Sequence, residues 1–392
     1  MPDESSTDAS GSSQNDPEKG TNQIRQRKAE HVAFALANDI SAPQAASWAD
    51  IRLVHRALPE VDLDAVDTSV RFLGATLRHP LWISSLTGGD PEVMVINERL
   101  ATIAEEYGLA MGVGSQRAAV ITPELAQSYR IARERAPHAF LVANVGAPQL
   151  IPQGQHPAFS VEQAREAVQM ISANALAVHL NFLQEAAQPE GDRRARGALA
   201  AVSRLAREVG VPVIAKETGA GISYEQAHAL KQAGVAAIDV GGAGGSSMAA
   251  LEGLRARSRG QERAVAISRV FRDWGIATPV ALVEAREGAL GLPLLATGGV
   301  RSGLDVARAL ALGATLVGMG FPFLQAASRG LDALHEFVEG VLAELRVAMQ
   351  LTGSASVADL QQTSVLVTGA SREWLELRGF GNELRALARR GM

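Results

Sequence analysis

Four side chains that can bind a metal or form hydrogen bonds lie close together in the segment HLNFLQE, residues 179–185. His179 and Asn181 would share one face of a strand, and Gln184 and Glu185 follow at its end. A single carboxylate beside a phosphate-bearing substrate is the usual protein ligand of Mg²⁺, which keeps several waters. Glu185 is therefore a candidate Mg²⁺ ligand. The alternative interpretation is a core histidine followed by a solvated carboxylate.

Lys216 ends the apolar run at residues 212–216. Its ammonium should therefore have little water around it, and a negative group must compensate its charge. Three interpretations remain open from this residue alone. They are an ion pair with a neighbouring carboxylate, a Schiff-base lysine, and a cation next to an electron-rich cofactor.

Glycines follow two apolar runs in the last third of the chain, in ATGGVRSG (296–303) and GMG (318–320). Glycines let backbone N–H groups approach an anion, a following helix offers its positive N-terminus, and Arg301 adds a bidentate donor. We expect a phosphate group to bind there. The alternative is that Gly298 and Gly299 only form a tight strand-to-helix turn.

The segment IDVGGAGGSS, residues 238–247, holds four glycines around Ala243 and ends in two hydroxyls. Such a loop can wrap a planar ligand or serve as a flexible lid, and both interpretations stay open. Its spacing meets the dinucleotide-binding pattern only loosely, so it does not indicate a dinucleotide site.

Eight short apolar runs must position these residues. They are continuous in hydrophobicity, as parallel strands covered on both faces are. Helix-period segments lie between them, for example at 91–107, 160–172, 223–233 and 302–312. Eight strands that each precede a helix predict a closed (β/α)8 barrel, also called a TIM barrel, with a doubly wound open sheet as the alternative. The runs are 81–85, 109–113, 140–145, 175–180, 212–216, 235–240, 293–297 and 314–319.

The predicted barrel also predicts where chemistry occurs, because barrel active sites lie at the carboxyl ends of the strands. All eight of these ends are polar or rich in glycine. The long stretch 241–292 should contain an extra helix or a lid over the barrel mouth. Helical segments at 330–350 and 381–390 extend the fold without adding a domain, so we expect one domain over residues 23–392.

Composition excludes several classes of function. The 392 residues carry 37 Lys and Arg against 42 Asp and Glu, a formal net charge of −5, and no Cys. This balance gives no basic field for nucleic acid, and zero Cys excludes disulfides and thiolate nucleophiles. The sequence contains no apolar run of eighteen or more residues, so no membrane-spanning helix is expected. Residues 1–22 are nearly devoid of apolar side chains and lack signal-peptide features, which predicts a disordered tail and a cytoplasmic protein.

Arg27, Lys28 and His31 lie close together in the segment QIRQRKAEHVAFAL, residues 23–36. A charged helix face in solvent is one interpretation. The other is a segment that folds over the open barrel mouth and brings cations to a diphosphate.

Taken together, these motifs resemble the family of type 2 isopentenyl-diphosphate isomerases, flavin-dependent enzymes of isoprenoid biosynthesis. The likeness spans about residues 25–380, and its most specific part is HLNFLQEAAQPEGD at 179–192. The glycine loops alone are shared with other flavin barrels. Further carriers are RKAEH (27–31), SSLTGG (84–89), GVGSQR (112–117), ANVG (143–146), KETGAGIS (216–223), DVGGAGGSS (239–247), DWGIAT (273–278), GGVRSGLDVARALALGA (298–314) and GMGFPFL (318–324).

The resemblance implies a barrel that binds FMN and Mg²⁺ and interconverts isopentenyl and dimethylallyl diphosphate. The flavin is needed in its reduced form, with NADPH as the expected reductant, and is unchanged over the cycle. Flavin barrels with amphipathic C-terminal helices commonly assemble, so we expect a homo-oligomer. The catalytic residues would be Gln184, in an orienting or relaying role, and Lys216, whose charge would stabilise the reduced ring.

The resemblance also assigns binding residues, position by position. Glu185 would bind Mg²⁺. The diphosphate substrate would be held by Arg27, Lys28, His31, Arg117, His179, Asn181 and Gln184. FMN would be held by Leu86, Thr87, Gly88, Ser115, Asn144, Lys216, Ser246, Gly298, Gly299, Arg301, Met319 and Gly320.

Four positions depart from the usual family pattern. Leu86 replaces a methionine, Gly241 a serine, Met248 an aromatic residue and Gly320 an alanine. Gly241 removes a possible hydroxyl contact to FMN, so cofactor affinity is the property most affected. The alternative function, an FMN-dependent oxidoreductase of the 2-hydroxy-acid oxidase type, needs a histidine base with a nearby arginine, and no His-x-x-Arg occurs near 241–300.

Overall fold

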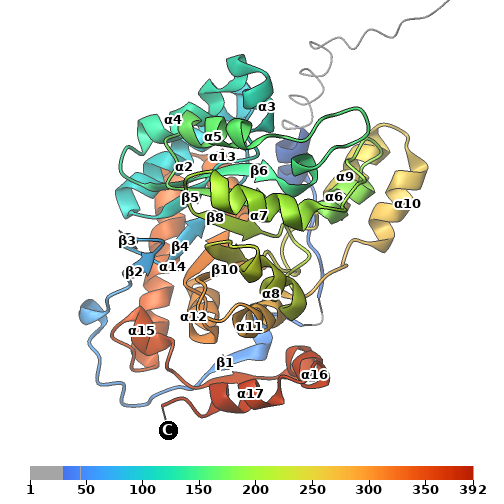
Figure 1. The fold of residues 1–392 in the computed structure, drawn as a ribbon. Coiled ribbons are helices and arrows are strands. Elements are labelled where there is room, and N and C mark those ends of the chain that lie inside the picture. The colour runs from blue at the N-terminus through green and yellow to red at the C-terminus, as the bar shows by residue number, and fades with distance from the viewer. Residues whose placement is uncertain (1–29, 45, 392) are drawn as a thin grey trace, which may run out of the picture.

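The computed structural model describes residues 30–44 and 46–391 (Figure 1). Predictions for the tail at 1–22 and for Arg27 and Lys28 fall outside this part of the chain. Eight parallel strands close into a barrel with helices around it, so the predicted (β/α)8 fold is confirmed and the open sheet is excluded. In chain order the barrel strands are β4 (Leu81–Ile83), β5 (Ala110–Gly112), β6 (Phe140–Gly146), β7 (Ala175–His179), β8 (Val213–Lys216), β9 (Ala237–Asp239), β10 (Leu294–Thr297) and β11 (Leu316–Met319).

Seven of the eight predicted apolar runs contain one of these strands, and the run 140–145 covers β6 except for Gly146, because both strand faces are buried. One face lies in the barrel interior and the other lies under the helices. The helices that follow the strands begin at N-caps visible in the sequence, such as Ser160, Ser223 and Ser302, whose side chains each accept a backbone N–H. These helices include α2 (Met94–Tyr107), α5 (Val161–Met170), α6 (Phe182–Ala187), α7 (Ala198–Glu208), α8 (Tyr224–Gln232), α11 (Thr278–Gly288), α12 (Gly303–Leu312) and α13 (Phe321–Arg329).

The stretch 241–292 holds two helices ahead of the crossover helix α11, as predicted. They are α9 (Met248–Ser258) and α10 (Glu262–Val270), which pack against each other. Figure 1 shows this pair projecting from the barrel on the side where α6 lies. The extra helices therefore build up one end of the barrel.

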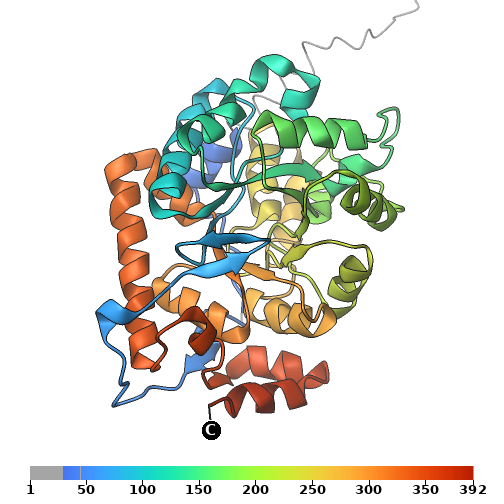
Figure 2. The ribbon, with the colours of Figure 1, turned by 60° about the vertical axis from the view of Figure 1, so that its left-hand side comes forward.

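A hairpin closes the opposite end. Strands β2 (Val70–Phe72) and β3 (Ala75–Leu77) pair antiparallel. Phe72 packs edge-on against Phe140, the first residue of β6, with ring centroids 5.4 Å apart. Phe72 and Leu77 share a buried cluster with Trp82 and other residues of the barrel interior. Figure 2 shows the hairpin in front of the ring of strands. A ligand must therefore enter at the carboxyl ends.

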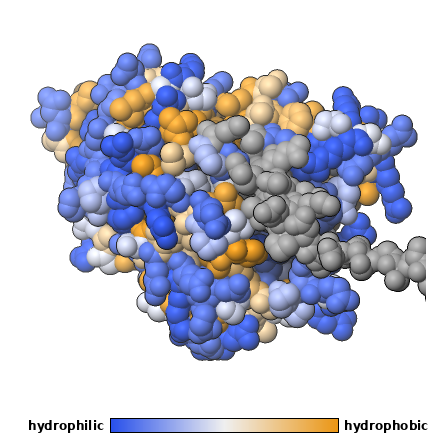
Figure 3. Space-filling view, turned by 90° about the horizontal axis from the view of Figure 1, so that it is seen from above, coloured by the Kyte–Doolittle hydropathy of each residue, from blue (hydrophilic) through white to orange (hydrophobic). Residues whose placement is uncertain are grey.

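The chain ends in helices that pack on the outside of the barrel. They are α14 (Leu331–Leu351), α15 (Val357–Leu360), α16 (Gly369–Leu377) and α17 (Gly381–Ala388), and β12 (Val365–Val367) pairs with β1 (Ile51–Leu53). Leu345, Leu375 and Leu387 belong to the main buried core, so these elements complete it. Within the described residues, no helix is long and apolar enough to cross a membrane. Hydrophilic side chains cover most of the face shown in Figure 3.

Candidate active site

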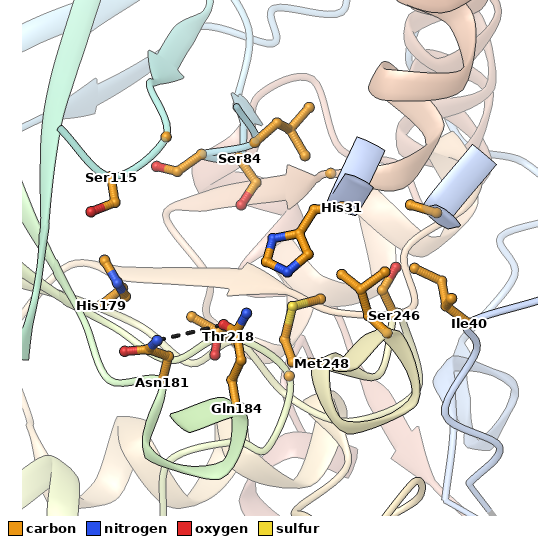
Figure 4. A pocket seen from close by; sticks show the side chains of 18 of the residues that line it. His31, Ile40, Ser84, Ser115, His179, Asn181, Gln184, Thr218, Ser246 and Met248 are labelled. Carbon is orange, nitrogen blue, oxygen red and sulfur yellow. Dashed lines mark hydrogen bonds between the residues drawn. The ribbon is translucent and has the colours of Figure 1, made fainter. Parts of the chain in front are cut away.

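A cavity of about 1080 Å³ lies at the carboxyl ends of the barrel strands (Figure 4). Residues that end or follow all eight barrel strands line it, as the sequence predicts. Its volume is at the upper end of the usual range for ligand pockets, roughly 300–1,000 Å³. The cavity can therefore hold a cofactor and a second small molecule together.

Most predicted binding residues line this single cavity. Of the predicted flavin contacts, ten are in the wall: Leu86, Ser115, Asn144, Lys216, Ser246, Gly298, Gly299, Arg301, Met319 and Gly320. Of the predicted substrate and metal contacts, the wall includes His31, Arg117, His179, Asn181, Gln184 and Glu185. Figure 4 shows His31, His179 and Gln184 around one space.

Thr87 and Gly88, which were also predicted to hold FMN, are not among the residues that line the cavity. A Cβ on Gly88 would lie 2.2 Å from Cε1 of Tyr129, so close packing explains this glycine. The carbonyl of Thr87 accepts hydrogen bonds from Gly114 N at 2.8 Å and from Asn97 Nδ2 at 3.2 Å. The wall after β4 is formed instead by Ser84, Ser85 and Leu86.

The turn after β10 needs its two glycines. Gly298 has φ +116°, and a Cβ there would lie 2.1 Å from the carbonyl oxygen of Gly242. Gly299 has φ +71°, and its Cβ would lie 2.7 Å from the carbonyl oxygen of Gly244. The loops after β9 and β10 therefore touch backbone to backbone, which by itself explains both glycines, and the expected phosphate site stays a prediction.

Arg301, in the same turn, places a cationic guanidinium in the cavity wall. Burial lowers the pKa of its guanidinium, with nearby Asp305 acting in the opposite direction. Its Nη1 donates to the carbonyl of Val300 at 2.9 Å. Among residues 30–44 and 46–391, no carboxylate forms an ion pair with it. A phosphate in the cavity would supply the missing negative charge.

Gly241 is required by the backbone. It has φ +46°, and a Cβ there would lie 2.1 Å from the carbonyl oxygen of Glu217. The loop after β9 therefore leaves no room for a serine side chain, and a hydroxyl contact at this position is sterically excluded. Close packing of this loop on the loop after β8 therefore explains why Gly241 stands where the family pattern has a serine.

The loop after β8 is shaped by Glu217. Its Oε2 accepts the backbone N–H groups of Thr218 and Gly219, each at 2.6 Å, and those of Ala220 and Gly221. Burial raises the pKa of Glu217 to about 7, although these four donors oppose the shift. Thr218 and Gly219 line the cavity, so this carboxylate fixes part of its wall.

Lys216 forms an ion pair with a neighbouring carboxylate, which is one of the three possibilities that the sequence left open. Its Nζ lies 3.0 Å from Oδ2 of Asp239, a fully buried carboxylate on the neighbouring strand. Nζ also donates to the carbonyl of Glu217 at 3.1 Å. Lys216 nevertheless remains in the cavity wall.

His179 is oriented by Asn144. The Asn144 amide donates from Nδ2 to the carbonyl of Val113 at 3.0 Å, so its Oδ1 is the acceptor that faces His179 Nδ1 at 2.8 Å. This assignment places the imidazole proton on Nδ1 and leaves Nε2 as the acceptor in the neutral ring. Gln116, which the sequence did not single out, accepts from the Asn144 backbone N–H at 3.0 Å.

Glu185 is buried, and three of its hydrogen bonds come from neutral donors. Its Oε1 accepts from Asn181 Nδ2 at 3.0 Å and from Gln149 Nε2 at 3.4 Å, and its Oε2 accepts from Asp192 N at 2.9 Å. Asn181 Oδ1 is buried without a hydrogen-bond partner. Three-residue clusters of His, Cys, Asp and Glu suited to a metal are absent from the described chain.

The sequence missed Glu252, a buried residue of α9 at the centre of this network. Its Oε1 lies 2.9 Å from His31 Nε2, 2.8 Å from Gln184 Nε2 and 3.1 Å from Gln188 Nε2. Its Oε2 accepts from Arg255, which also pairs with Glu30 and Glu190.

Burial opposes the ionisation of Glu252, but His31, Arg255 and Gln184 outweigh this effect and lower its pKa to about 2. Glu252 is therefore a carboxylate at neutral pH. It ties the segment that carries His31 to α6, which carries Gln184.

Comparison with known proteins defines the class first. The sequence model of the FMN-dependent dehydrogenase family matches residues 23–367. The fold is similar to the crystal structure of a putative lactate oxidase from Pediococcus acidilactici, with a TM-score of 0.63, 16% identity, and coverage of 90% of this chain and 94% of that chain. At this identity the similarity supports the fold alone.

Several curated proteins are far more similar. Isopentenyl-diphosphate delta-isomerases are 44% identical over 363 residues in Methanosarcina barkeri (92% of this chain, 97% of the relative) and 47% identical over 352 residues in Methanoregula boonei (89% and 96%). The Archaeoglobus fulgidus enzyme is 46% identical over 353 residues (90% and 99%). The chain belongs to the FMN-dependent dehydrogenase family and, within it, to the isopentenyl-diphosphate delta-isomerase family.

Proposed function

We propose that this chain interconverts isopentenyl and dimethylallyl diphosphate with reduced FMN and Mg²⁺. The convergence of Gln184, His179, Glu185 and the Arg301 turn on one cavity is the observation that supports this activity. Moving a double bond requires adding a proton at one carbon and removing another nearby. An unactivated alkene is a weak base, so the donor must be held against it with water excluded.

The cavity wall fits the flavin. The hydroxyl of Ser85 in the wall is buried without a hydrogen-bond partner among the described residues. Gly298 and Gly299 provide a wall without side chains, and Arg301 forms no ion pair with a described residue. We assign the phosphate of FMN to the Arg301 turn. The ring would lie toward Lys216 and Asn144. When bound, the reduced flavin supplies the acid and base of the reaction.

The chain's own residues orient the substrate. An amide is neither acid nor base near neutral pH, so Gln184 orients or relays. Its Nε2 donates a hydrogen bond to Glu252. This bond fixes the orientation of the amide and leaves the Gln184 carbonyl oxygen, Oε1, for other groups in the cavity. His31, Arg117, His179 and Asn181 would hold the diphosphate, with Arg27 and Lys28 contributing from outside the described residues. The apolar Val32, Ala35 and Ile40 of the N-terminal segment line the cavity and would help to exclude water from it.

Incubation of the full chain with reduced FMN, Mg²⁺ and isopentenyl diphosphate under anaerobic conditions should yield the allylic isomer. The flavin returns to its starting state, so we expect no net consumption of reductant. Product is measured by NMR, and oxidised FMN serves as the control that should give no turnover. Oxidation of NADPH in proportion to product would instead support the oxidoreductase and contradict this proposal.

We further propose that Glu185 binds Mg²⁺ together with oxygens of the diphosphate. Glu185→Gln should weaken the Mg²⁺ dependence of turnover by about tenfold or more, because the amide cannot supply a negative oxygen. The visible spectrum should still report bound FMN. The control is Asp192→Asn, which changes a rim carboxylate bonded to Gln149 and should alter Mg²⁺ dependence less. Loss of flavin in the Glu185 variant would show that this residue belongs to a different site.

A further inference from the structure

The Lys216–Asp239 ion pair is part of the barrel itself. Lys216 ends β8 and Asp239 ends β9, and the two residues are register partners in the parallel ladder. Adjacent strands carry partners of one register on the same face of a sheet. The backbone therefore brings the two side chains to one face, where Nζ and Oδ2 lie 3.0 Å apart.

Asp239 is held as firmly as its partner. Its carboxylate is fully buried, and its Oδ1 accepts from the Thr297 hydroxyl at 2.5 Å and from Gly241 N at 3.3 Å. Three consecutive strands, β8, β9 and β10, therefore contribute to one buried group of polar side chains. Oδ1 already accepts these two hydrogen bonds, so Oδ2 is the oxygen that pairs with Lys216.

The Lys216 ammonium has three N–H donors. The Glu217 carbonyl accepts one of them, and Asp239 Oδ2 lies 3.0 Å from Nζ as an ion-pair partner. The side chain is 8% exposed and lines the cavity, so a group in the cavity can accept from a remaining donor. A buried ammonium without its carboxylate would be unfavourable, and side-chain freedom would then move it away from the wall.

We propose that Asp239 is a positioning residue, which acts through Lys216 by fixing that ammonium at the cavity wall, where it faces the negative charge of a reduced ligand. This inference rests on the proposed binding of FMN. It differs from a purely structural role, because a structural role predicts equal effects on oxidised and reduced flavin. A fixed cation favours the reduced flavin, which carries more negative charge.

The test is a double-mutant cycle of wild type, Asp239→Asn, Lys216→Met and the double variant. The dissociation constant of FMN is measured by titration in air and again after chemical reduction. The ratio of the two constants gives the preference for the reduced form. We expect Asp239→Asn and Lys216→Met each to lower this preference by about tenfold or more. In the Lys216→Met background, Asp239→Asn should change it less than about twofold.

Three results would overturn the inference. One is an unchanged preference in Asp239→Asn. Another is an increased preference, which would mean that the carboxylate opposes the anion more than it helps Lys216. The third is a double variant whose loss of preference for reduced FMN equals the product of the losses in the two single variants. Asp239 would then act independently of Lys216. Failure of the wild type to bind FMN would count against the proposed function instead.

The double variant also guards against a fold that fails. If Asp239→Asn does not fold, circular dichroism will show it, whereas the double variant lacks both charges and leaves neither buried alone. In that case the preference for reduced FMN is compared between Lys216→Met and the double variant. Equal preference for reduced FMN supports the inference, and unequal preference contradicts it.

Discussion

Gly298→Ala should both destabilise the barrel and abolish tight flavin binding. The new Cβ would meet the Gly242 carbonyl oxygen at 2.1 Å and the Thr278 hydroxyl at 2.4 Å, and the residue has φ +116°. Overpacking against backbone together with a strained φ should lower the free energy of unfolding by about 4 kcal/mol. Urea denaturation measures this loss, which is large beside a typical stability of about 5–15 kcal/mol.

Gly244→Ala is the matched control for Gly298→Ala. Gly244 has nearly the same backbone angle, φ +111°, but a Cβ there would meet nothing within 4 Å. It should therefore show only the backbone strain, about 1–2 kcal/mol. FMN affinity should fall by about a hundredfold in Gly298→Ala, because the loops after β9 and β10 must separate. Equal behaviour of the two variants would contradict the close packing of these loops.

The barrel could be predicted from sequence because its cause is local. Strands buried on both faces appear as continuous apolar runs, and N-capping serines mark several of the helices between them. The site followed from one topological rule, since residues after each strand end meet at the same mouth. His179 and Arg301 lie far apart in the chain, yet both were placed in the cavity in this way.

Glu252 could not be predicted in this way. It lies within a helix rather than at a strand end, and its partners Gln184 and His31 are 68 and 221 residues away. Nothing in its neighbourhood in the sequence distinguishes it from a solvated carboxylate. Asp239 did leave a signal, because it is a charged residue inside the apolar run VAAIDV. A buried charge requires a partner, and Lys216 ends the preceding run.

Gly241 shows a different limit of the sequence. Its identity suggested a lost hydroxyl, whereas the structure gives it a left-handed φ and a backbone neighbour where a side chain would lie. Backbone angles and the contact between two loops depend on the packed barrel. A sequence position can therefore be recognised as unusual without revealing whether function or packing requires it.

Glu252→Gln should impair both turnover and stability. The amide presents at most one oxygen, whereas the carboxylate serves His31, Gln184 and Gln188 on Oε1 and Arg255 on Oε2. Misplacing the Gln184 amide should lower kcat/KM by about a hundredfold. Weakening the pairing of buried Arg255 should lower the free energy of unfolding by about 3 kcal/mol. The isomerisation assay and urea denaturation measure these effects.

The pH dependence of stability provides a separate check on Glu252. Its pKa of about 2 lies below that of an unfolded glutamate, 4.5. Its stabilisation is therefore complete above pH 4.5 and is lost as the pH falls toward 2, a contribution of about 3 kcal/mol. The difference in unfolding free energy between wild type and Glu252→Gln should shrink over this range.

Glu30→Gln is the control for Glu252→Gln, because Glu30 also pairs with Arg255, at 3.2 Å, but makes no contact with Gln184. It lies at the edge of the network, with its side chain 20% exposed. We expect a loss below about 1 kcal/mol and kcat/KM within about threefold of wild type. If Glu30→Gln were as damaging as Glu252→Gln, charge balance around Arg255 would explain both variants. Orientation of Gln184 by Glu252 would then have no support.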